Sequence, residues 1–203
     1  MVEIITNEKV KIILQAARKR FAHYGFSKVT MDEIAGDVEL GKASLYYYFP
    51  TKEELFKAVI FQEQAEFIKR VEVLLQKPSS AKEKLDEYIE HRLTFSRELT
   101  NLGTLSIHSV FDIKSVFKKL YEDFEEQELI LLKKIIDEGK CTGEFRNDLP
   151  DELTKVFLHI LQGLKLRFIR FLKEQRPEDE IHKELESEMK LVTDVLITGM
   201  KNR

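Results

Sequence analysis

Apolar residues recur three and four positions apart along nearly the whole chain, and no stretch alternates as a half-buried strand would. The first stripe predicts a helix that begins at Thr6 or Asn7, both good N-cap residues. Gly25 stands where a left-handed C-cap residue is needed, and Phe26 can supply the accompanying apolar contact. The buried side of this helix is expected to consist of Val10, Ile13, Leu14, Ala17 and Phe21.

Two short helices should follow the first. A capping box, Thr30 with Glu33 three residues later, opens the second helix, which ends near Val38. A third helix covers residues 42–49 after a tight turn, and Pro50 ends it because proline cannot continue a helix. The first fifty residues therefore predict a compact group of three helices.

Six further helices are predicted over the rest of the chain, which makes about nine in an all-α fold. A second capping box, Thr51 with Glu54, opens the first of them, a long helix. Gly139, Gly143 and Pro150 mark residues 139–150 as a loop. The six helices cover about residues 51–75, 85–103, 104–111, 116–139, 151–174 and 179–201.

The composition supports a globular helical chain and excludes several other classes of protein. Of the 203 residues, 43% are hydrophobic, enough to bury a core, while only 8 are glycine and 4 are proline. The single cysteine excludes an internal disulfide framework and a multi-cysteine zinc site. The sequence shows no long uncharged apolar run and no secretory leader. We therefore expect a soluble, cytoplasmic protein with no membrane partner.

Charge is distributed unevenly along the chain, whose formal net charge is -3. Residues 1–52 carry eight basic and six acidic side chains, a net charge of +2, and the remainder carries −5. This asymmetry suggests two parts with different partners. We predict a domain boundary after residue 52, with residues 1–52 in one domain and residues 53–203 in the other.

The third predicted helix has the composition of a DNA-reading helix. Leu45 and Phe49 lie four residues apart and so share a face that can pack inward. The other positions offer an ammonium, a methyl, a hydroxyl and two phenols, groups that can bind guanine, contact a thymine methyl and reach phosphates. These outward residues are Lys42, Ala43, Ser44, Tyr46 and Tyr47. Two short helices joined by a tight turn predict a helix-turn-helix unit.

Two residues at helix starts are candidate phosphate clamps. Thr30 and Lys52 stand where free N–H groups and the helix dipole favour an anion. Such clamps would fix the register of the reading helix on the duplex, while the reading helix supplies specificity.

Residues from about 10 to 56 resemble the DNA-binding region of the TetR family of bacterial transcriptional regulators. The resemblance is carried by FAHYGF at residues 21–26, VTMDEIA at residues 29–35 and KASLYYYFPTKEELF at residues 42–56. It implies a homodimer whose two reading helices enter successive major grooves of a near-palindromic operator. It also places Thr30, Tyr48 and Lys52 on phosphates, and makes residues 53–203 an effector-binding and dimerisation domain.

The chain departs from the family pattern at two turn positions. The family usually has glycine where this chain has Glu39, and often serine or threonine where it has Gly41. Glu39 would be strained if its φ is positive, unless Gly41 shifts the turn. Its carboxylate should also repel phosphate, so we expect an atypical turn geometry or operator affinity.

The last two predicted helices are candidates for a dimer bundle, and the long helix from Thr51 links them to the DNA-binding part. In the predicted helix over residues 151–174, apolar side chains cover more than one face, which suggests burial both within the chain and against a partner. Candidate interface residues are Phe157, Leu161, Leu164 and Phe168 on the first helix and Leu185, Val192 and Leu196 on the second.

Candidate effector contacts combine many aromatic side chains with few polar ones. A pocket of this kind favours an apolar or aromatic effector. The candidates are His91, Phe95, His108, Phe111, Phe124 and Gln162. The same residues also fit ordinary core packing, and both interpretations stay open. Cys141 is similarly either a redox sensor or incidental, and the acidic run at residues 122–128 is interpreted as a solvated helix face.

Enzyme motifs are missing from the sequence. No histidine follows a glutamate by three residues, as ferritin-like metal sites require, and no glycine-rich phosphate loop or nucleophile elbow occurs. We therefore expect that the protein is not an enzyme and binds no cofactor or metal. We expect it to be a ligand-responsive transcriptional regulator that acts as a repressor. The alternative is a helical protein–protein interaction module with no DNA target, whose binding would lack the steep salt dependence of phosphate contacts.

Overall fold

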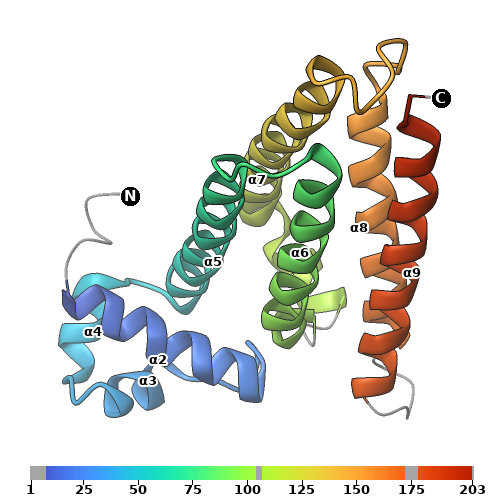
Figure 1. Cartoon of the computed structure of the whole chain (residues 1–203). Helices are drawn as coiled ribbons and strands as arrows, with labels where there is room; N and C mark the ends of the chain where they lie inside the picture. The colour runs from blue at the N-terminus through green and yellow to red at the C-terminus, as the bar shows by residue number, and fades with distance from the viewer. Residues whose placement is uncertain (1–7, 104–106, 172–177, 203) are drawn as a thin grey trace. The chain divides into compact units, whose positions relative to one another are not determined.

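The structure, a computed structural model, describes residues 8–103, 107–171 and 178–202, without the side chains of residues 96–118 and 165–178. These residues form an all-α fold, as the sequence predicts, with eight helices (Figure 1). The helices are α2 (Glu8–Tyr24), α3 (Met31–Asp37), α4 (Lys42–Tyr48), α5 (Lys52–Leu75), α6 (Ala81–Gly103), α7 (Ile107–Cys141), α8 (Leu153–Phe171) and α9 (Glu178–Met200). No helix in the described ranges is both long and apolar enough to cross a membrane.

The chain packs as two compact units. One unit contains Met1–Ala65 and Glu98–Tyr121, and the other contains Glu66–Arg97 and Glu122–Arg203. Helices α2, α3 and α4 lie wholly in the first unit, and α8 and α9 lie wholly in the second. Each of α5, α6 and α7 contributes residues to both units. The predicted domain boundary after residue 52 stays a prediction.

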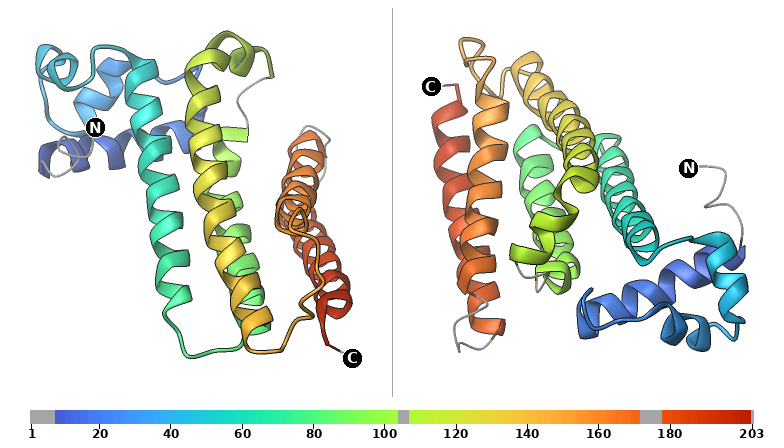
Figure 2. Two further views of the ribbon diagram at one scale, coloured as in Figure 1. Left: turned by 90° about the horizontal axis from the view of Figure 1, so that it is seen from above. Right: turned by 180° about the vertical axis from the view of Figure 1, so that it is seen from behind.

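In the first unit, α3 packs against both α2 and α4 (Figure 2). The apolar stripe predicted for the first helix is buried, and Gly25 has a left-handed φ of 78°. The ring of Phe26 packs 5.8 Å from that of Phe21 and 4.8 Å from that of Phe56. The Gly25 C-cap and the Phe26 contact are therefore confirmed.

The second unit contains a helical hairpin and an aromatic interior. Helices α8 and α9 lie side by side in every view (Figures 1 and 2). On the other helices of this unit, the Phe67 ring lies 4.8 Å from the Phe95 ring and 5.7 Å from the Phe124 ring. Phe67 and Phe95 are buried.

Helix α7 differs from the prediction at both ends. The separate short helix predicted at residues 104–111 is wrong for residues 107–111, which form the start of α7. Neither glycine nor proline occurs between residues 107 and 138, so nothing in this stretch stops the helix. At the other end α7 continues past Gly139 to Cys141, and Gly143 adopts the left-handed φ of 77°.

Gly139 is glycine because of packing and not because a helix ends there. A Cβ atom at Gly139 would overlap ring carbons of the fully buried Phe145 and would lie 2.9 Å from Cβ of Ala81. The missing side chain thus lets the loop after α7 and the start of α6 approach α7 closely.

Candidate nucleic-acid interface

Helix α4 is anchored to the core by the two residues that the sequence predicts to point inward. Leu45 is fully buried and Phe49, the C-cap residue, is 6% exposed. The helix starts at Lys42 after an N-cap, Gly41, that has no side chain to make a capping hydrogen bond. With both anchors on one side, the remaining side chains of α4 are left for another partner.

The outward face of α4 is exposed as predicted. Lys42, Ala43, Ser44 and Tyr46 are exposed, and Tyr47 is the most exposed aromatic of the helix at 83%. Tyr48 is half-buried, and its ring packs edge-on at 5.3 Å from the ring of Tyr47. No residue of α4 is acidic, so this face presents one cation and several hydrogen-bonding hydroxyls.

Lys42 already holds an anion of its own chain. Its Nζ donates to Oδ2 of Asp32 in α3 at 2.9 Å, and both side chains are well exposed. The hydrogen bond and charge of Asp32 raise the pKa of Lys42. An exposed ion pair is worth little in water. A phosphate can therefore replace Asp32 at small cost, although Asp32 competes with it.

The turn between α3 and α4 is a Schellman motif with Glu39 at its left-handed position. Leu40 N–H donates to the Ala35 carbonyl at 2.9 Å, and Glu39 N–H donates to the Gly36 carbonyl at 3.2 Å. Glu39 has a φ of 54°, the only positive value at a non-glycine residue in the described chain. Gly41 has an ordinary φ of −64°, so it does not shift the turn. The positive φ expected at Glu39 is therefore confirmed.

Thr30 forms the predicted capping box with Glu33. The Thr30 N–H and hydroxyl both donate to Oε2 of Glu33 at 2.8 Å, and Glu33 N–H donates back to the Thr30 hydroxyl at 3.3 Å. The hydrogen bonds from Thr30 lower the pKa of Glu33. The Thr30 hydroxyl can still accept a bond, but its proton is committed to Glu33. Its proposed hold on a phosphate stays a prediction.

Lys52 fastens the start of α5 to the loop before α3. Its Nζ donates to the carbonyl oxygens of Phe26 and Val29, both at 2.9 Å, and lies 4.5 Å from the centroid of the Phe26 ring. Two of its three N–H donors are therefore used inside the protein. Neither carbonyl uses the third donor, and the predicted contact of Lys52 with a phosphate stays a prediction.

An ion pair of Arg20, which the sequence did not reveal, joins α2 to α3. The Arg20 guanidinium binds Asp37 in two-pronged fashion, with Nη2 2.8 Å from Oδ1 and Nε bonded to Oδ2, and Nη1 lies 3.4 Å from Glu33. The Arg20 hydrogen bond and charge lower the pKa of Asp37. Such bidentate pairs fix orientation as well as distance. Arg20 thus helps to fix the orientation of α3 relative to α2.

The predicted effector residues fall in different surroundings. His91 lies half-buried on α6, and its Nε2 is 3.8 Å from Oε1 of Glu87. Phe95 and Phe124 belong to the aromatic interior around Phe67. Gln162 lies on α8 and donates to Oε2 of Glu125 at 3.4 Å. The two remaining candidates, His108 and Phe111, lie outside the residues whose side chains are described.

A buried polar cluster was missed because Glu128 belongs to the run interpreted as a solvated face. That interpretation is wrong for Glu128, which is 1% exposed. The Tyr88 hydroxyl donates to its Oε1 at 2.6 Å, and Arg92 Nη1 bonds the same oxygen. Glu128 lies four residues after Phe124, on the apolar stripe of α7, and this spacing is the signal that could have revealed it.

Three of the seven predicted dimer residues are buried within their own chain. Phe157, Leu161 and Leu185 are at most 3% exposed. Residues half-buried in the chain are Leu164, Val192 and Leu196, and Phe168 lies outside the described side chains. The apolar side chains open to a partner are different ones: Val156 is 49%, Leu191 64% and Val195 63% exposed.

The described residues contain no cluster of three or more His, Cys, Asp or Glu side chains that could hold a metal ion. Cys141 is exposed at the end of α7.

Known proteins resemble this chain both over its whole length and over the helix-turn-helix. The family model for bacterial regulatory proteins, tetR family, matches residues 13–59. The crystal structure of a transcriptional regulator from Cytophaga hutchinsonii ATCC 33406 is 34% identical with a TM-score of 0.86, covering 97% of this chain and 100% of that chain. The HTH-type transcriptional regulator YhgD of Bacillus subtilis (strain 168) is 24% identical over 167 residues, 77% of this chain and 82% of its own length. The HTH-type transcriptional regulator RutR of Escherichia coli (strain K12) is 43% identical over 54 residues, 27% of this chain and 26% of its own length.

Proposed function

Because the chain belongs to the tetR family of bacterial regulatory proteins, we propose that it represses transcription as a homodimer bound to a near-palindromic operator. Regulation of transcription through DNA binding, without enzymatic activity, is the function of this family. A small-molecule effector binds residues of the second unit and releases the operator.

The observation that carries the proposal is the division of α4 into two faces. Leu45 and Phe49 are buried on one side of the helix, while Lys42, Ser44 and Tyr47 are exposed on the other, and α4 itself contains no acidic residue. A short helix held in this way fits the major groove, where lysine binds guanine and serine binds either kind of base edge.

Backbone phosphates would be held around this helix. Lys42 exchanges Asp32 for a phosphate or a base, Tyr48 is placed at the edge of the exposed face, and Thr30 and Lys52 begin the flanking helices. Contacts of this kind fix register and supply most of the salt dependence of binding.

A salt titration tests the DNA-binding part of the proposal. With a labelled duplex, log K should fall by about 0.9 for each phosphate contact per tenfold rise in salt. Asp32→Asn should raise affinity by about two- to fivefold, because it frees Lys42 from a competing anion. Asp148→Asn is the matched control, since Asp148 forms an exposed pair with Arg146 at 3.3 Å in the second unit. A flat salt response would favour the protein–protein interaction module.

Dimerisation is proposed through the open face of α8 and α9. Leu191 and Val195 lie one turn apart on α9, and Val156 adds an exposed apolar side chain on α8. A Cβ added at Gly163 or Gly199 would meet nothing within 4 Å, so a second chain has room to approach there. Leu191 and Val195 share a face of α9, and neighbouring exposed apolar side chains of this kind are typical of a protein interface.

Size-exclusion chromatography with light scattering tests this interface. Leu191→Glu combined with Val195→Glu should convert the protein to a monomer and abolish binding to a two-fold operator. Ile12→Glu is the control, because Ile12 on α2 is an apolar side chain of similar exposure, 48%, and belongs to the first unit, which contains neither α8 nor α9. A dimer that survives the double substitution would contradict the assignment.

A further inference from the structure

The loop between α2 and α3 presents one exposed lysine from a backbone that is held on both sides. Phe26 and Val29 are 7% and 1% exposed, so their side chains anchor the loop in the core of the first unit. The Lys52 ammonium donates to the carbonyl oxygens of the same two residues, both at 2.9 Å. Between these anchors, Ser27 and Lys28 are exposed. The backbone at Lys28 is therefore held in place while its side chain reaches solvent.

Lys28 forms no hydrogen bond or ion pair with any other described residue. The other lysines around α3 are bonded within the chain. The Lys42 ammonium donates to Asp32, and Lys52 uses two of its three N–H donors on carbonyl oxygens. A phosphate that binds Lys42 must compete with a carboxylate of the protein. Lys28 offers its full charge and all three donors to a phosphate without such a competitor.

Lys28 also lies close to the start of α3 and to the start of the reading helix. Two residues of chain span at most about 7 Å, so the Cα atoms of Lys28 and Thr30 lie within that distance of each other. Asp32, two residues further on, is bonded to Lys42 at the first position of α4. The exposed lysine, the N-cap of α3 and the first residue of α4 are therefore joined by one short path.

The spacing of DNA phosphates matches this path. Successive phosphates of one strand are about 3.4 Å apart along the duplex axis. A backbone that brings Thr30 to one phosphate therefore brings the flexible four-carbon stem of Lys28 within reach of the same phosphate or the next one.

We propose that Lys28 binds a phosphate of the duplex backbone and is a further positioning residue of the DNA interface. The proposal rests on the proposed function, because it adds a contact to the same interface. Phosphate contacts carry no sequence information, so Lys28 contributes affinity and register and leaves base preference to α4.

A salt titration with a labelled duplex of random sequence tests Lys28, because phosphate contacts supply binding without an operator. In Lys28→Gln, the slope of log K against log salt should become shallower by about 0.9 for each protomer on the duplex, and affinity at about 0.1 M salt should fall by at least about fivefold. Lys28→Arg keeps the charge and should retain the slope of the parent. The midpoint of urea denaturation should be unchanged in both variants, because the Lys28 side chain has no partner within the described chain.

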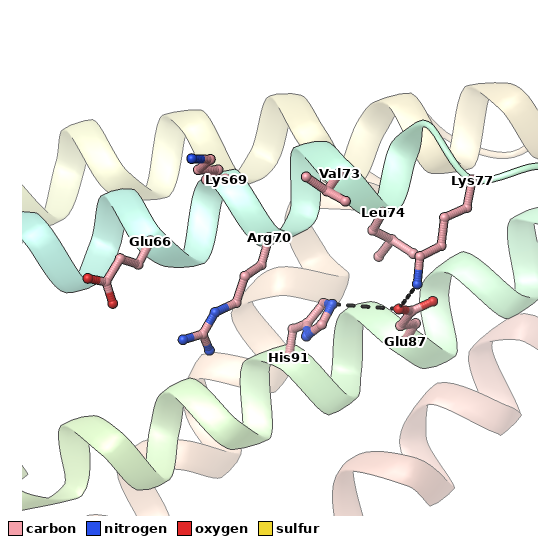
Figure 3. Close-up of a pocket in the computed structure, with 8 residues that line it drawn as sticks. All are labelled: Glu66, Lys69, Arg70, Val73, Leu74, Lys77, Glu87 and His91. Atoms are coloured by element: carbon pink, nitrogen blue, oxygen red, sulfur yellow. Dashed lines mark hydrogen bonds and ion pairs between the residues drawn. The ribbon is translucent and has the colours of Figure 1, made fainter.

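Lys69→Gln is the matched control. Lys69 on α5 is an exposed lysine of the second unit, beside a groove in which Lys77 is bonded to Glu87. Figure 3 shows Lys69 without an ion pair to the other residues that line this groove. The substitution removes the same charge from a part of the protein outside the helix-turn-helix, so the salt slope should stay that of the parent.

Three results would overturn the proposal: an unchanged slope in Lys28→Gln, an equal loss of slope in Lys69→Gln or Lys28→Arg, or a lowered urea midpoint in Lys28→Gln. The salt response of the parent protein separates this proposal from the proposed function. A flat parent response would overturn the proposed function itself. A steep parent response that Lys28→Gln leaves unchanged would overturn only the contact of Lys28.

Discussion

Glu39 offers a sharp test, because strain and charge at this position act on different measurements. Its φ of 54° places a side chain in the left-handed region, where a non-glycine residue costs about 1–2 kcal/mol. Glycine removes that cost but gives up about 0.5–1 kcal/mol through the greater freedom of the unfolded chain. Glu39→Gly should therefore raise the free energy of unfolding by about 0.5–1 kcal/mol.

Glu39→Gln separates the two effects. It keeps the strained Cβ and removes the charge, so the free energy of unfolding should stay within about 0.3 kcal/mol of the parent. One carboxylate about 10 Å from a phosphate in water costs about 0.4 kcal/mol, so both substitutions should raise duplex affinity by about twofold.

Urea denaturation and fluorescence anisotropy with a labelled duplex provide the two readouts. A destabilised Glu39→Gly variant would refute the strain argument, since the Schellman hydrogen bonds of Leu40 and residue 39 are made by the backbone and survive the substitution. Unchanged duplex affinity in both variants would refute the placement of Glu39 near phosphate.

The other predictions concern ties within each unit. Lys52→Met should lower the free energy of unfolding by about 2–3 kcal/mol, because two carbonyl oxygens lose a charged donor, and urea denaturation measures this. If Lys52→Ala weakened DNA binding but left the free energy of unfolding unchanged, the structural role of Lys52 would be contradicted. Asp37 has a lowered pKa beside Arg20, so the pair stabilises the fold above about pH 4 and loses that contribution as the pH falls through the folded pKa. In Asp37→Asn the free energy of unfolding should therefore depend less on pH in the acid range. A pH dependence equal to that of the parent would refute the role of the pair. Gly139→Ala should lower the free energy of unfolding by about 1–3 kcal/mol, because the added methyl group overpacks against the buried ring of Phe145. Gly36→Ala, with open space around it, should raise the free energy of unfolding by about 0.5–1 kcal/mol. Equal shifts of the thermal unfolding midpoint in the two variants would refute the packing argument.

Local signals in the sequence located most helix ends correctly. The left-handed Gly25, the Thr30–Glu33 capping box and the inward pair Leu45 and Phe49 are all present in the structure. Each depends on residues within four positions of one another, so the physics that selects them is visible in a short stretch of chain.

Interactions between distant residues could not be predicted in this way. Lys52 looks like an exposed cation at a helix start, yet its ammonium bonds carbonyls 23 and 26 residues earlier in the chain. Glu128 looks like one of several surface acids, yet it is buried beneath Tyr88 from another helix. Both depend on which helices become neighbours, and periodicity within one helix carries no information on that.

The dimer face illustrates the same limit of helical periodicity. Helical periodicity identifies apolar residues such as Phe157 and Leu185, and the chain buries these two by itself. Exposed Leu191 and Val195 stand out only when the fold shows which apolar side chains have been left uncovered.

Selection of bound duplexes from a random pool, with the parent protein and with Ser44→Ala, tests whether α4 reads the DNA sequence. We expect enrichment of a two-fold symmetric site whose half-sites lie about 10 base pairs or a multiple apart. Ser44→Ala should keep that spacing and relax base preference at one position in each half-site. No enriched sequence, or a selected site that Ser44→Ala leaves unaltered at every position, would contradict the assignment of α4 as the reading helix.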